Sequence, residues 1–420
     1  MTMTTPALTR RQAERRFVLL TAVRWLPVGL TIGMTVLLPL ERGLGLAEIG
    51  VLLSVQGFVV LGLELPTGGL ADAIGRRPLL LAASALAVAS TCVFLLAESF
   101  AVFAIALVLQ GVFRALDSGP LEAWFVDVAL ADDPDAPLDT PLGRGAAALG
   151  IAIAAGAAAG GALVAWHPFA AMSALVLPFI LAAALYAVSG VLVAILVREP
   201  ARARVTLRFA VRETPLAMRG GVRLLRGSGV LRALVLVEVF WSIAMIAFES
   251  LTPIRLAEQL GAESTAAAVF GPSSALAWGL FAVGSASVPL LRRRLGTAGA
   301  AIAMRAVNGL FVVLMGLAAG PAGLLIGYGL AYLTHGAAGP VHNALLHRQS
   351  GPQTRAMVLS MNSMIAGGSY SLGLLVLMPL AEVTSPAVAI VAAGAFSVVG
   401  ALGYLPALRQ ERSGPVAENT

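Results

Sequence analysis

Long apolar runs, separated by short polar stretches, occupy almost the whole chain. A membrane-spanning helix needs about 20 consecutive, mostly apolar residues, and windows of that kind recur between residues 17 and 406. Twelve such spans are predicted, at residues 17–40, 46–68, 78–97, 100–123, 145–166, 170–197, 230–255, 267–291, 298–319, 322–346, 357–380 and 386–406. The pattern therefore predicts an all-α integral membrane protein with twelve transmembrane helices.

The longest polar segment, residues 198–229, follows the sixth span and divides the chain into two halves of six spans each. We therefore expect an N-terminal domain at 1–197 and a C-terminal domain, with a short tail, at 230–420. In the segment between them, arginines recur at helical spacing along one side, with apolar residues interleaved. This segment is either a linker of amphipathic helices lying on anionic lipid or a solvated basic loop that only fixes the topology.

The two halves carry similar markers in the same order. A proline lies near the end of the first and seventh spans, a Gly-Pro pair lies in the fourth and tenth, and an arginine precedes the fifth and eleventh. The pairs are Pro39 and Pro253, Pro120 and Pro340, and Arg144 and Arg355, at offsets of 214, 220 and 211. Each offset is close to half the chain, which indicates an internal duplication of the kind found in many transporters.

Composition supports a membrane location and excludes several other classes of protein. The 420 residues are 58% hydrophobic and 12% charged, whereas a typical soluble domain carries about 25% charged residues. The net charge is +6, and all 28 basic residues are arginine. Because these arginines lie between apolar spans, they indicate membrane topology rather than nucleic-acid binding. A lone cysteine, Cys92, gives no disulfide framework within the chain.

The distribution of arginine predicts the orientation of the chain in the membrane. With twelve spans, both termini lie on one side, and we assign 23 of the 28 arginines to that side. Arg42 and Arg255 fall on the other side, and Arg24, Arg114 and Arg305 fall within spans. Because loops rich in arginine stay inside, we expect a multi-pass protein of the cytoplasmic (cell) membrane with both termini in the cytoplasm.

One short charged segment interrupts the apolar pattern between the second and third spans. It contains Gly68, Asp72, Gly75, Arg76 and Arg77. Charges held between two hydrophobic helices are costly. The segment is therefore predicted to form a hairpin loop at the membrane face, where its charges help to position the two helices.

At these residues the sequence resembles the major facilitator superfamily. The signature of that family between spans two and three is Gly-x-x-x-Asp-(Arg/Lys)-x-Gly-Arg-(Arg/Lys), and the chain departs from it at Ala73, where a basic residue is usual. Residues 64–68 and 118–124, with Asp127, resemble a bacterial, efflux-like branch. The fifth span lacks the Gly-Pro ending of the antiporter motif of the family. After span eight, residues 292–296 contain arginines with no acid before them, so the second half lacks an intact copy of the signature.

The resemblance implies a fold of two pseudo-symmetric six-helix bundles and a gating latch. In the family this loop works with an acid at the cytoplasmic end of span four, which places Asp72, Arg76 and Asp127 in one cluster. Arg76 shared by two carboxylates at a half-desolvated interface forms strong charge-assisted hydrogen bonds. We expect these residues and the rest of the signature to hold the bundles closed on the cytoplasmic side. Alternatively, the arginines only satisfy the topology, and Asp72 caps a turn.

Polar residues inside the spans are candidates for coupling or for lining a substrate cavity, because burying charge in lipid is costly. They are Arg24, Gln56, Arg114, Asp117, Glu238, Trp241, Arg305, Asn308 and His335. Arg114 and Asp117, three residues apart, are expected to pair on one helix face, for coupling or only for packing. The offset of 214 carries Arg24 onto Glu238, which predicts a state-dependent pair between the halves. Snorkelling of Arg24 to the cytoplasmic surface is the alternative.

Together these features predict a secondary active transporter that moves a small solute by rocking two six-helix halves about a midplane site. The branch resemblance favours export of amphipathic compounds, with protons as the candidate coupling ion; uptake or facilitated diffusion of a metabolite is the alternative. A receptor or lipid-handling scaffold on the same fold is the alternative of another class. We expect membrane lipids as partners, a monomer, no nucleic acid, no cofactor, no metal and no enzymatic activity, because no phosphate-binding Gly-Lys-Ser/Thr loop or metal-ligand spacing occurs.

Overall fold

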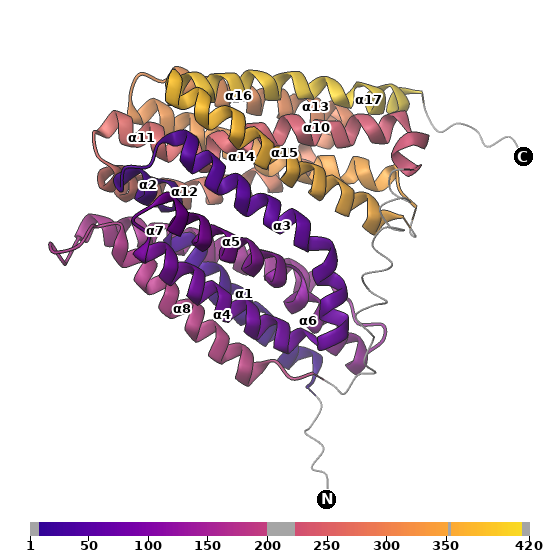
Figure 1. Cartoon of the computed structure of the whole chain (residues 1–420). Coiled ribbons are helices and arrows are strands. Elements are labelled where there is room, and N and C mark those ends of the chain that lie inside the picture. Colours follow the sequence, from indigo (N-terminus) through magenta and orange to yellow (C-terminus); the bar gives the residue numbers. More distant parts are fainter. Residues whose placement is uncertain (1–7, 200–222, 352–353, 414–420) are drawn as a thin grey trace, which may run out of the picture. The chain divides into compact units, whose positions relative to one another are not determined.

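Helices form the regular structure of this protein (Figure 1). The computed structural model describes residues 8–199, 223–351 and 354–413, and in these ranges it contains no strand. The N-terminal helices are α1 (Arg10–Leu30), α2 (Met34–Glu41), α3 (Leu46–Ile74), α4 (Arg76–Leu96), α5 (Phe100–Asp117), α6 (Pro120–Asp132), α7 (Asp139–Trp166) and α8 (Val176–Leu196). The C-terminal helices are α10 (Gly229–Ile246), η1 (Ala247–Leu251), α11 (Thr252–Leu260), α12 (Glu263–Ala286), α13 (Val288–Leu317), α14 (Pro321–Arg348), α15 (Arg355–Val383), α16 (Pro386–Gly400), η2 (Ala401–Tyr404) and α17 (Leu405–Arg412).

In the described ranges, these helices account for all twelve predicted spans. The first span is α1 with α2, the fourth is α5 with α6, the seventh runs from α10 to α11, and the twelfth from α16 to α17; each other span is a single helix. Eleven of the twelve are long and apolar enough to cross a membrane. The remaining span, α14, has 28 residues, but its glycine, tyrosine and histidine residues lower its mean hydropathy.

The helices assemble into two compact units. Unit 1 contains Met1–Ile32 and Phe58–Thr214, and unit 2 contains Gly33–Gly57 and Pro215–Thr420. The hairpin between the first two spans therefore packs with the C-terminal helices, where Ser54 donates a 2.8 Å hydrogen bond to the carbonyl of Ser371 on α15. The division into domains at 1–197 and 230–420 stays a prediction. Residues 200–222, most of the basic linker, lie outside the described residues.

The two units repeat the same helix neighbours. In unit 1, α1 packs against α7 and α8, and α4 packs against α5 and α8. In unit 2, α10 packs against α15 and α16, and α13 packs against α14 and α16 (Figure 1). The first set joins spans one, three, four, five and six, and the second joins spans seven, nine, ten, eleven and twelve in the same way. The helix packing thus follows the internal duplication.

The first and seventh spans are interrupted at equivalent positions. The first span breaks before Gly33, whose φ of 75° lies in the left-handed region that favours glycine. In the seventh span the π-helical turn η1 begins at Ala247, 214 residues further on. Single π-turns inside α-helices often mark functional positions. Each half therefore has an irregular turn at the equivalent position of its first span.

The Gly-Pro pairs of the fourth and tenth spans behave differently. Gly119 has a φ of 91° and separates α5 from α6, with Pro120 as the first residue of α6. At this position the missing N–H of proline costs nothing, because the first turn of a helix has no partner for it. Pro340 instead lies inside the continuous helix α14. A Gly-Pro pair therefore interrupts the fourth span but not the tenth. The difference lies in the backbone of the glycine before the proline, which is left-handed at Gly119.

Small residues allow α1 and α7 to pack closely. A Cβ added at Gly156 would meet the Leu26 carbonyl oxygen and come within 2.8 Å of the Leu30 nitrogen, both backbone atoms that cannot turn aside. Close approach at small residues is a common way for membrane helices to associate. The glycine-rich fifth span is thus explained by packing.

Gly156→Ala is expected to destabilise the protein by about 1–3 kcal/mol, the usual cost of overpacking. Gly143 lies on the same helix with nothing within 4 Å of an added Cβ, so Gly143→Ala is the matched control and should be neutral or slightly stabilising. The melting temperatures of the two purified variants check this. Equal melting temperatures would contradict the close packing of α1 on α7.

Candidate functional site

The signature between spans two and three forms a helix junction rather than a loop. α3 continues to Ile74 and α4 begins at Arg76, so Gly75 alone separates the two helices. Gly75 has a φ of 96°, a conformation that residues with a side chain rarely adopt. Gly68 and Asp72 lie within α3, but the surroundings of the Asp72 side chain are outside the described part of the structure. The predicted contact of Asp72 with the latch cluster is therefore untested.

Hydrogen bonds join the junction to α6 and to the end of α8, both in unit 1. Arg76 Nε donates to Asp127 Oδ2 of α6 at 2.7 Å, and the side chains are 13% and 30% exposed. The backbone nitrogen of Arg76 donates to Glu199 Oε1 at 2.5 Å. Arg77 Nη2 donates to the carbonyl of Ala194 on α8 at 2.7 Å. The structure brings Arg76 and Asp127 together; their role as a latch stays a prediction.

A second junction with the same geometry lies in unit 2. Inside α13, Gly296 has a φ of 73° and kinks the helix. Glu411 of α17 accepts hydrogen bonds from the backbone nitrogens of Thr297 at 3.0 Å and Ala298 at 2.8 Å, as Glu199 does at the start of α4. A carboxylate at the free N–H groups of a helix start is stabilising by about 1 kcal/mol. The second half thus keeps the geometry of the signature without its sequence.

Glu199 and Glu411 are residues of the two junctions that sequence reasoning missed. Each follows the last span of its half, and they lie 212 positions apart (411 − 199), within the range of the other repeat offsets. This spacing was the signal that could have identified them. The spacing alone could not identify their contacts, because the partner of each carboxylate is a backbone N–H, which every residue type except proline carries.

Within unit 1, Asp117 pairs with Arg24 and not with Arg114. Arg24 Nη2 of α1 donates to Asp117 Oδ1 and to the Asp117 carbonyl oxygen, the latter at 3.2 Å. The two side chains are only 10% and 19% exposed, whereas Arg114 is exposed. The predicted pairing on one helix was wrong because Asp117 is the last residue of α5, where its side chain meets a neighbouring helix.

Removing one partner of this pair should destabilise unit 1. Breaking a buried ion pair costs about 3–5 kcal/mol, and partial exposure lowers this, so we expect Arg24→Gln to cost about 2 kcal/mol. Arg114→Gln serves as the control and should cost less than about 0.5 kcal/mol. The charge-swapped double variant Arg24→Asp with Asp117→Arg should recover part of the loss. Melting temperatures in detergent measure all three, and no recovery in the double variant would contradict a direct pair.

Unit 2 contains a buried network of ionisable side chains from four elements. His342 Nε2 on α14 lies 3.1 Å from Glu238 Oε1 on α10, and His342 Nδ1 lies 2.9 Å from the Tyr404 hydroxyl on η2. Arg305 Nη2 on α13 lies 3.5 Å from the same hydroxyl and 4.0 Å from Glu238 Oε1. Glu238, Arg305 and His342 are 7%, 2% and 2% exposed, so the network is shielded from solvent.

The partners of His342 favour one tautomer when Glu238 is ionised. An ionised carboxylate only accepts hydrogen bonds, so in that state His342 Nε2 is the donor to Glu238, 3.1 Å away. Asn362 Oδ1, 3.3 Å from Nε2, also accepts. Nδ1 is then free to accept from the Tyr404 hydroxyl, whose oxygen accepts from Arg305. A continuous chain of donors thus runs from Arg305 through Tyr404 and His342 to Glu238.

The sequence profile of the Major Facilitator Superfamily matches residues 17–332, well over half of the chain. The chain belongs to the Major Facilitator Superfamily. It is therefore a multi-pass membrane transporter with twelve transmembrane helices in two pseudo-symmetric six-helix bundles.

Solved structures share this fold at low sequence identity. The nucleoside transporter NupG is 12% identical, with a TM-score of 0.76 over 94% of this chain and 99% of its own. A bacterial homologue of the human lysosomal transporter Spinster is 15% identical, with a TM-score of 0.73 over 95% and 97%. The human organic anion transporter MFSD10 is 18% identical, with a TM-score of 0.60 over 93% and 99%. No curated protein matches the sequence, and these similarities show the fold alone.

The other predicted cavity residues of this superfamily member lie in unit 2 but in different surroundings. Asn308 is fully buried and donates to the Ala331 carbonyl at 2.7 Å. Trp241 and His335 stack on each other, with ring centroids 4.3 Å apart. Gln56 lies on α3 and is 8% exposed. Trp241 also contacts Arg305 of the ionisable network, 4.2 Å from the ring centroid to the guanidinium carbon, whereas Gln56 lies in the segment that packs with α15.

The predicted pair of Arg24 with Glu238 is not tested by the contacts observed. Arg24 and Glu238 each have a partner within their own unit, so a state-dependent pair between them stays a prediction. Glu249 accepts from the Tyr370 hydroxyl at 3.0 Å.

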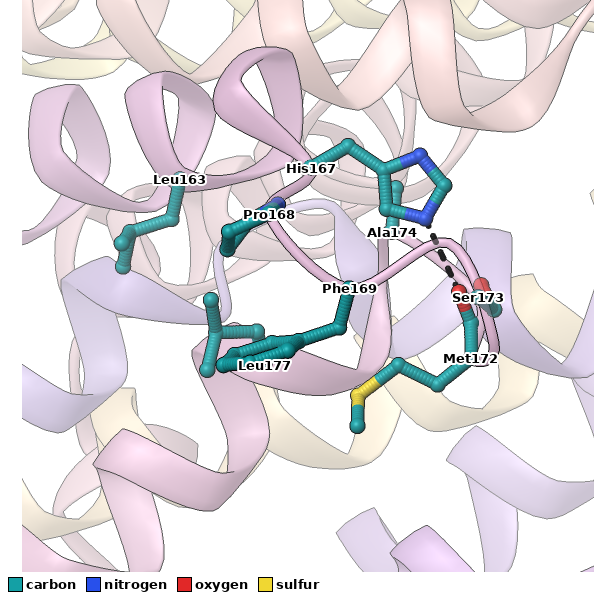
Figure 2. Close-up of a pocket in the computed structure, with 8 residues that line it drawn as sticks. All are labelled: Leu163, His167, Pro168, Phe169, Met172, Ser173, Ala174 and Leu177. Carbon is teal, nitrogen blue, oxygen red and sulfur yellow. Dashed lines mark hydrogen bonds between the residues drawn. The ribbon is translucent and has the colours of Figure 1, made fainter.

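A small hollow at the turn between α7 and α8 is a poor candidate for a substrate site (Figure 2). In Figure 2, His167 Nε2 bonds to the carbonyl oxygen of Met172 at 2.9 Å across this turn. The hollow has essentially no room for a water-sized molecule, whereas ligand pockets commonly enclose about 300–1,000 Å³. Its lining residues are Leu163, His167, Pro168, Phe169, Met172, Ser173, Ala174 and Leu177.

Proposed function

We propose that this protein is a secondary active transporter that exports a small amphipathic solute from the cytoplasm across the cell membrane, driven by protons. Transport proceeds by alternating access, with the halves 1–197 and 230–420 rocking about a midplane site. Export follows the resemblance of residues 64–68 and 118–127 to an efflux-like branch. In this proposal both termini lie in the cytoplasm, and the Arg76–Asp127 pair latches the cytoplasmic side.

The observation that carries the proposal is the buried network of Glu238, His342, Arg305 and Tyr404. A scaffold or receptor has no need of ionisable groups inside the membrane, because each one is costly there. A carboxylate beside an imidazole can share an arriving proton, and such chains are the usual proton relays of transporters. With Glu238 ionised and Arg305 protonated, the network is neutral, and one added proton changes its charge by +1. Rearrangement between these two charge states would couple proton binding to the transport cycle.

Reconstitution of the purified protein in liposomes tests this function. Amphipathic compounds that raise its melting temperature serve as candidate substrates, and a pH-sensitive dye inside the liposomes records proton movement. We expect compound-dependent proton flux that an ionophore abolishes. Compounds that bind without any flux would favour a receptor. Flux of the compound that does not respond to the ionophore would indicate facilitated diffusion and overturn proton coupling.

A further inference from the structure

Arg305 carries more hydrogen-bond donors than the protein satisfies. Its side chain is 2% exposed, yet Nε and Nη1 have no hydrogen-bond partner in the described structure. Its remaining nitrogen, Nη2, makes only the long contacts to Tyr404 and Glu238 at 3.5 and 4.0 Å. An unpaired buried guanidinium is costly, and buried polar groups in native proteins almost always have partners. The arrangement therefore favours an anion as the missing partner.

The Trp241 ring covers one face of this guanidinium, and further aromatic rings extend from Trp241. Arg305 lies over the Trp241 ring, 4.2 Å from its centroid, and Trp241 stacks on His335. Phe281 lies 5.2 Å from the His335 ring and 5.6 Å from the Trp278 ring, between centroids. Trp241 is buried, whereas His335, Phe281 and Trp278 are partly exposed. These rings thus form a wall that extends from the buried guanidinium toward accessible surface.

The aromatic wall also carries unpaired polar atoms of its own. Trp278 Nε1 and His335 Nδ1 are buried and have no hydrogen-bond partner in the described structure. The indole N–H can only donate. The acid of the network, Glu238, accepts from His342 at 3.1 Å, and the Trp278 N–H has no acceptor in the described structure. The Trp278 N–H is therefore a further unpaired donor for an accepting ligand; Asn308 Oδ1, an acceptor on the Arg305 helix, is also unpaired in the described structure.

We propose that Arg305, Trp241, His335 and Trp278 form a substrate subsite in unit 2 for an organic anion with a planar aromatic group. The aromatic part lies against the partly exposed rings, and the anionic group accepts from Arg305. The subsite rests on the proposed transport function and deepens it by naming the substrate class. Stacking on Trp and His rings selects planar groups, and the unpaired guanidinium selects a negative charge.

Binding to the purified full-length protein tests the subsite without any transport assay. Isothermal titration is run with three aromatic carboxylates (salicylate, indole-3-acetate and 2-naphthoate), with the neutral 2-naphthamide and with the non-aromatic cyclohexanecarboxylate. A hydrogen bond to a charged group contributes about 1.5–3 kcal/mol, so the best carboxylate should bind at least about tenfold more tightly than 2-naphthamide. It should also bind more tightly than cyclohexanecarboxylate.

Two variants locate the binding. Arg305→Gln should weaken the best carboxylate at least about tenfold, whereas Arg293→Gln, at an exposed arginine on the same helix, should leave the affinity unchanged. If Arg305→Gln does not fold, Trp278→Phe removes the unpaired N–H while keeping a ring, and it should weaken binding about threefold or more.

The outcomes separate this inference from the proposed function. Three results would overturn the subsite and indicate internal water as the partner of Arg305. They are no binding by any of the three carboxylates, equal binding of 2-naphthoate and 2-naphthamide, and unchanged affinity in the folded Arg305→Gln variant. Proton-coupled flux of a cationic or neutral compound would then still support the transporter. Conversely, tight binding of the carboxylates without any flux would support the subsite and overturn the transport function.

Discussion

Glu238→Gln is expected to abolish proton-coupled transport while the protein still inserts and folds. Glutamine keeps the size of the side chain, and its carbonyl oxygen can still accept from His342 Nε2, which lies 3.1 Å from the carboxylate. An amide does not titrate, so the network can no longer take up and release a proton at this position. The variant should therefore exchange substrate between the two sides of a membrane without moving protons.

The same substitution removes an acidic neighbour of Arg305 at 4.0 Å. Loss of a partner from a buried pair costs up to about 3–5 kcal/mol, so folded yield and melting temperature must be measured first. The double variant Glu238→Gln with Arg305→Gln removes both charges and should recover stability without recovering coupling. Glu263→Gln, in the first turn of α12, is the control for loss of a carboxylate elsewhere.

Liposomes that contain labelled substrate and an internal pH-sensitive dye separate the two activities. The wild-type protein should show both substrate exchange and substrate-driven pH change, and Glu238→Gln only the exchange. A variant that folds and moves protons like the wild type would show that Glu238 is not the coupling carboxylate. The neighbours that bear on its titration are His342, Arg305 and Tyr404, together with the Asn362 amide.

Arg76→Glu is expected to abolish transport with little effect on membrane insertion. In the wild-type protein, Arg76 Nε donates to Asp127 at 2.7 Å, and Glu199 accepts from the Arg76 backbone nitrogen at 2.5 Å. The substitution replaces an attraction by repulsion between carboxylates at a partly desolvated site, where like charges cost several kcal/mol. If the proposed latch closes one side of the transporter, the variant cannot reach that state.

Arg11→Glu is the matched control because Arg11 is exposed on α1 and lies outside the signature. It changes the net charge by the same amount and should retain most of the transport. Arg76→Asp with Asp127→Arg restores an ion pair and should recover activity in part. Wild-type transport rates in Arg76→Glu liposomes, at equal amounts of inserted protein, would refute the latch.

The structure also explains why some contacts could be predicted and others could not. The pairing of Arg76 with Asp127 was expected from the resemblance to the superfamily, in which the loop between spans two and three works with an acid at the end of span four. The pairing of Asp117 was predicted wrongly because helical spacing made Arg114 the natural partner, while Arg24 is 93 residues away in sequence. Glu199 and Glu411 were missed because their partners are backbone N–H groups.

The network of Glu238, His342, Arg305 and Tyr404 shows the same limit. Glu238 and Arg305 stood out in the sequence because charge is rare in apolar spans. Tyr404 and Asn362 did not, since a single tyrosine or asparagine in a membrane helix has many ordinary roles. Their importance arises because η2 and α15 bring them to His342.

The sequence by itself determined the membrane class, the twelve spans, the two-fold repeat and the superfamily, because long apolar runs and a spaced signature are local features of the chain. Only the tertiary structure decided which charges are paired, that the signature is a one-glycine junction capped by Glu199, and that Gly296 and Glu411 repeat it. It also decided that Arg305 is buried with unpaired donors beside an aromatic wall. These contacts form between side chains of helices that are distant in the sequence. Away from water each buried polar atom needs a partner within the protein, and the separation of two residues in the sequence does not indicate which partner that is.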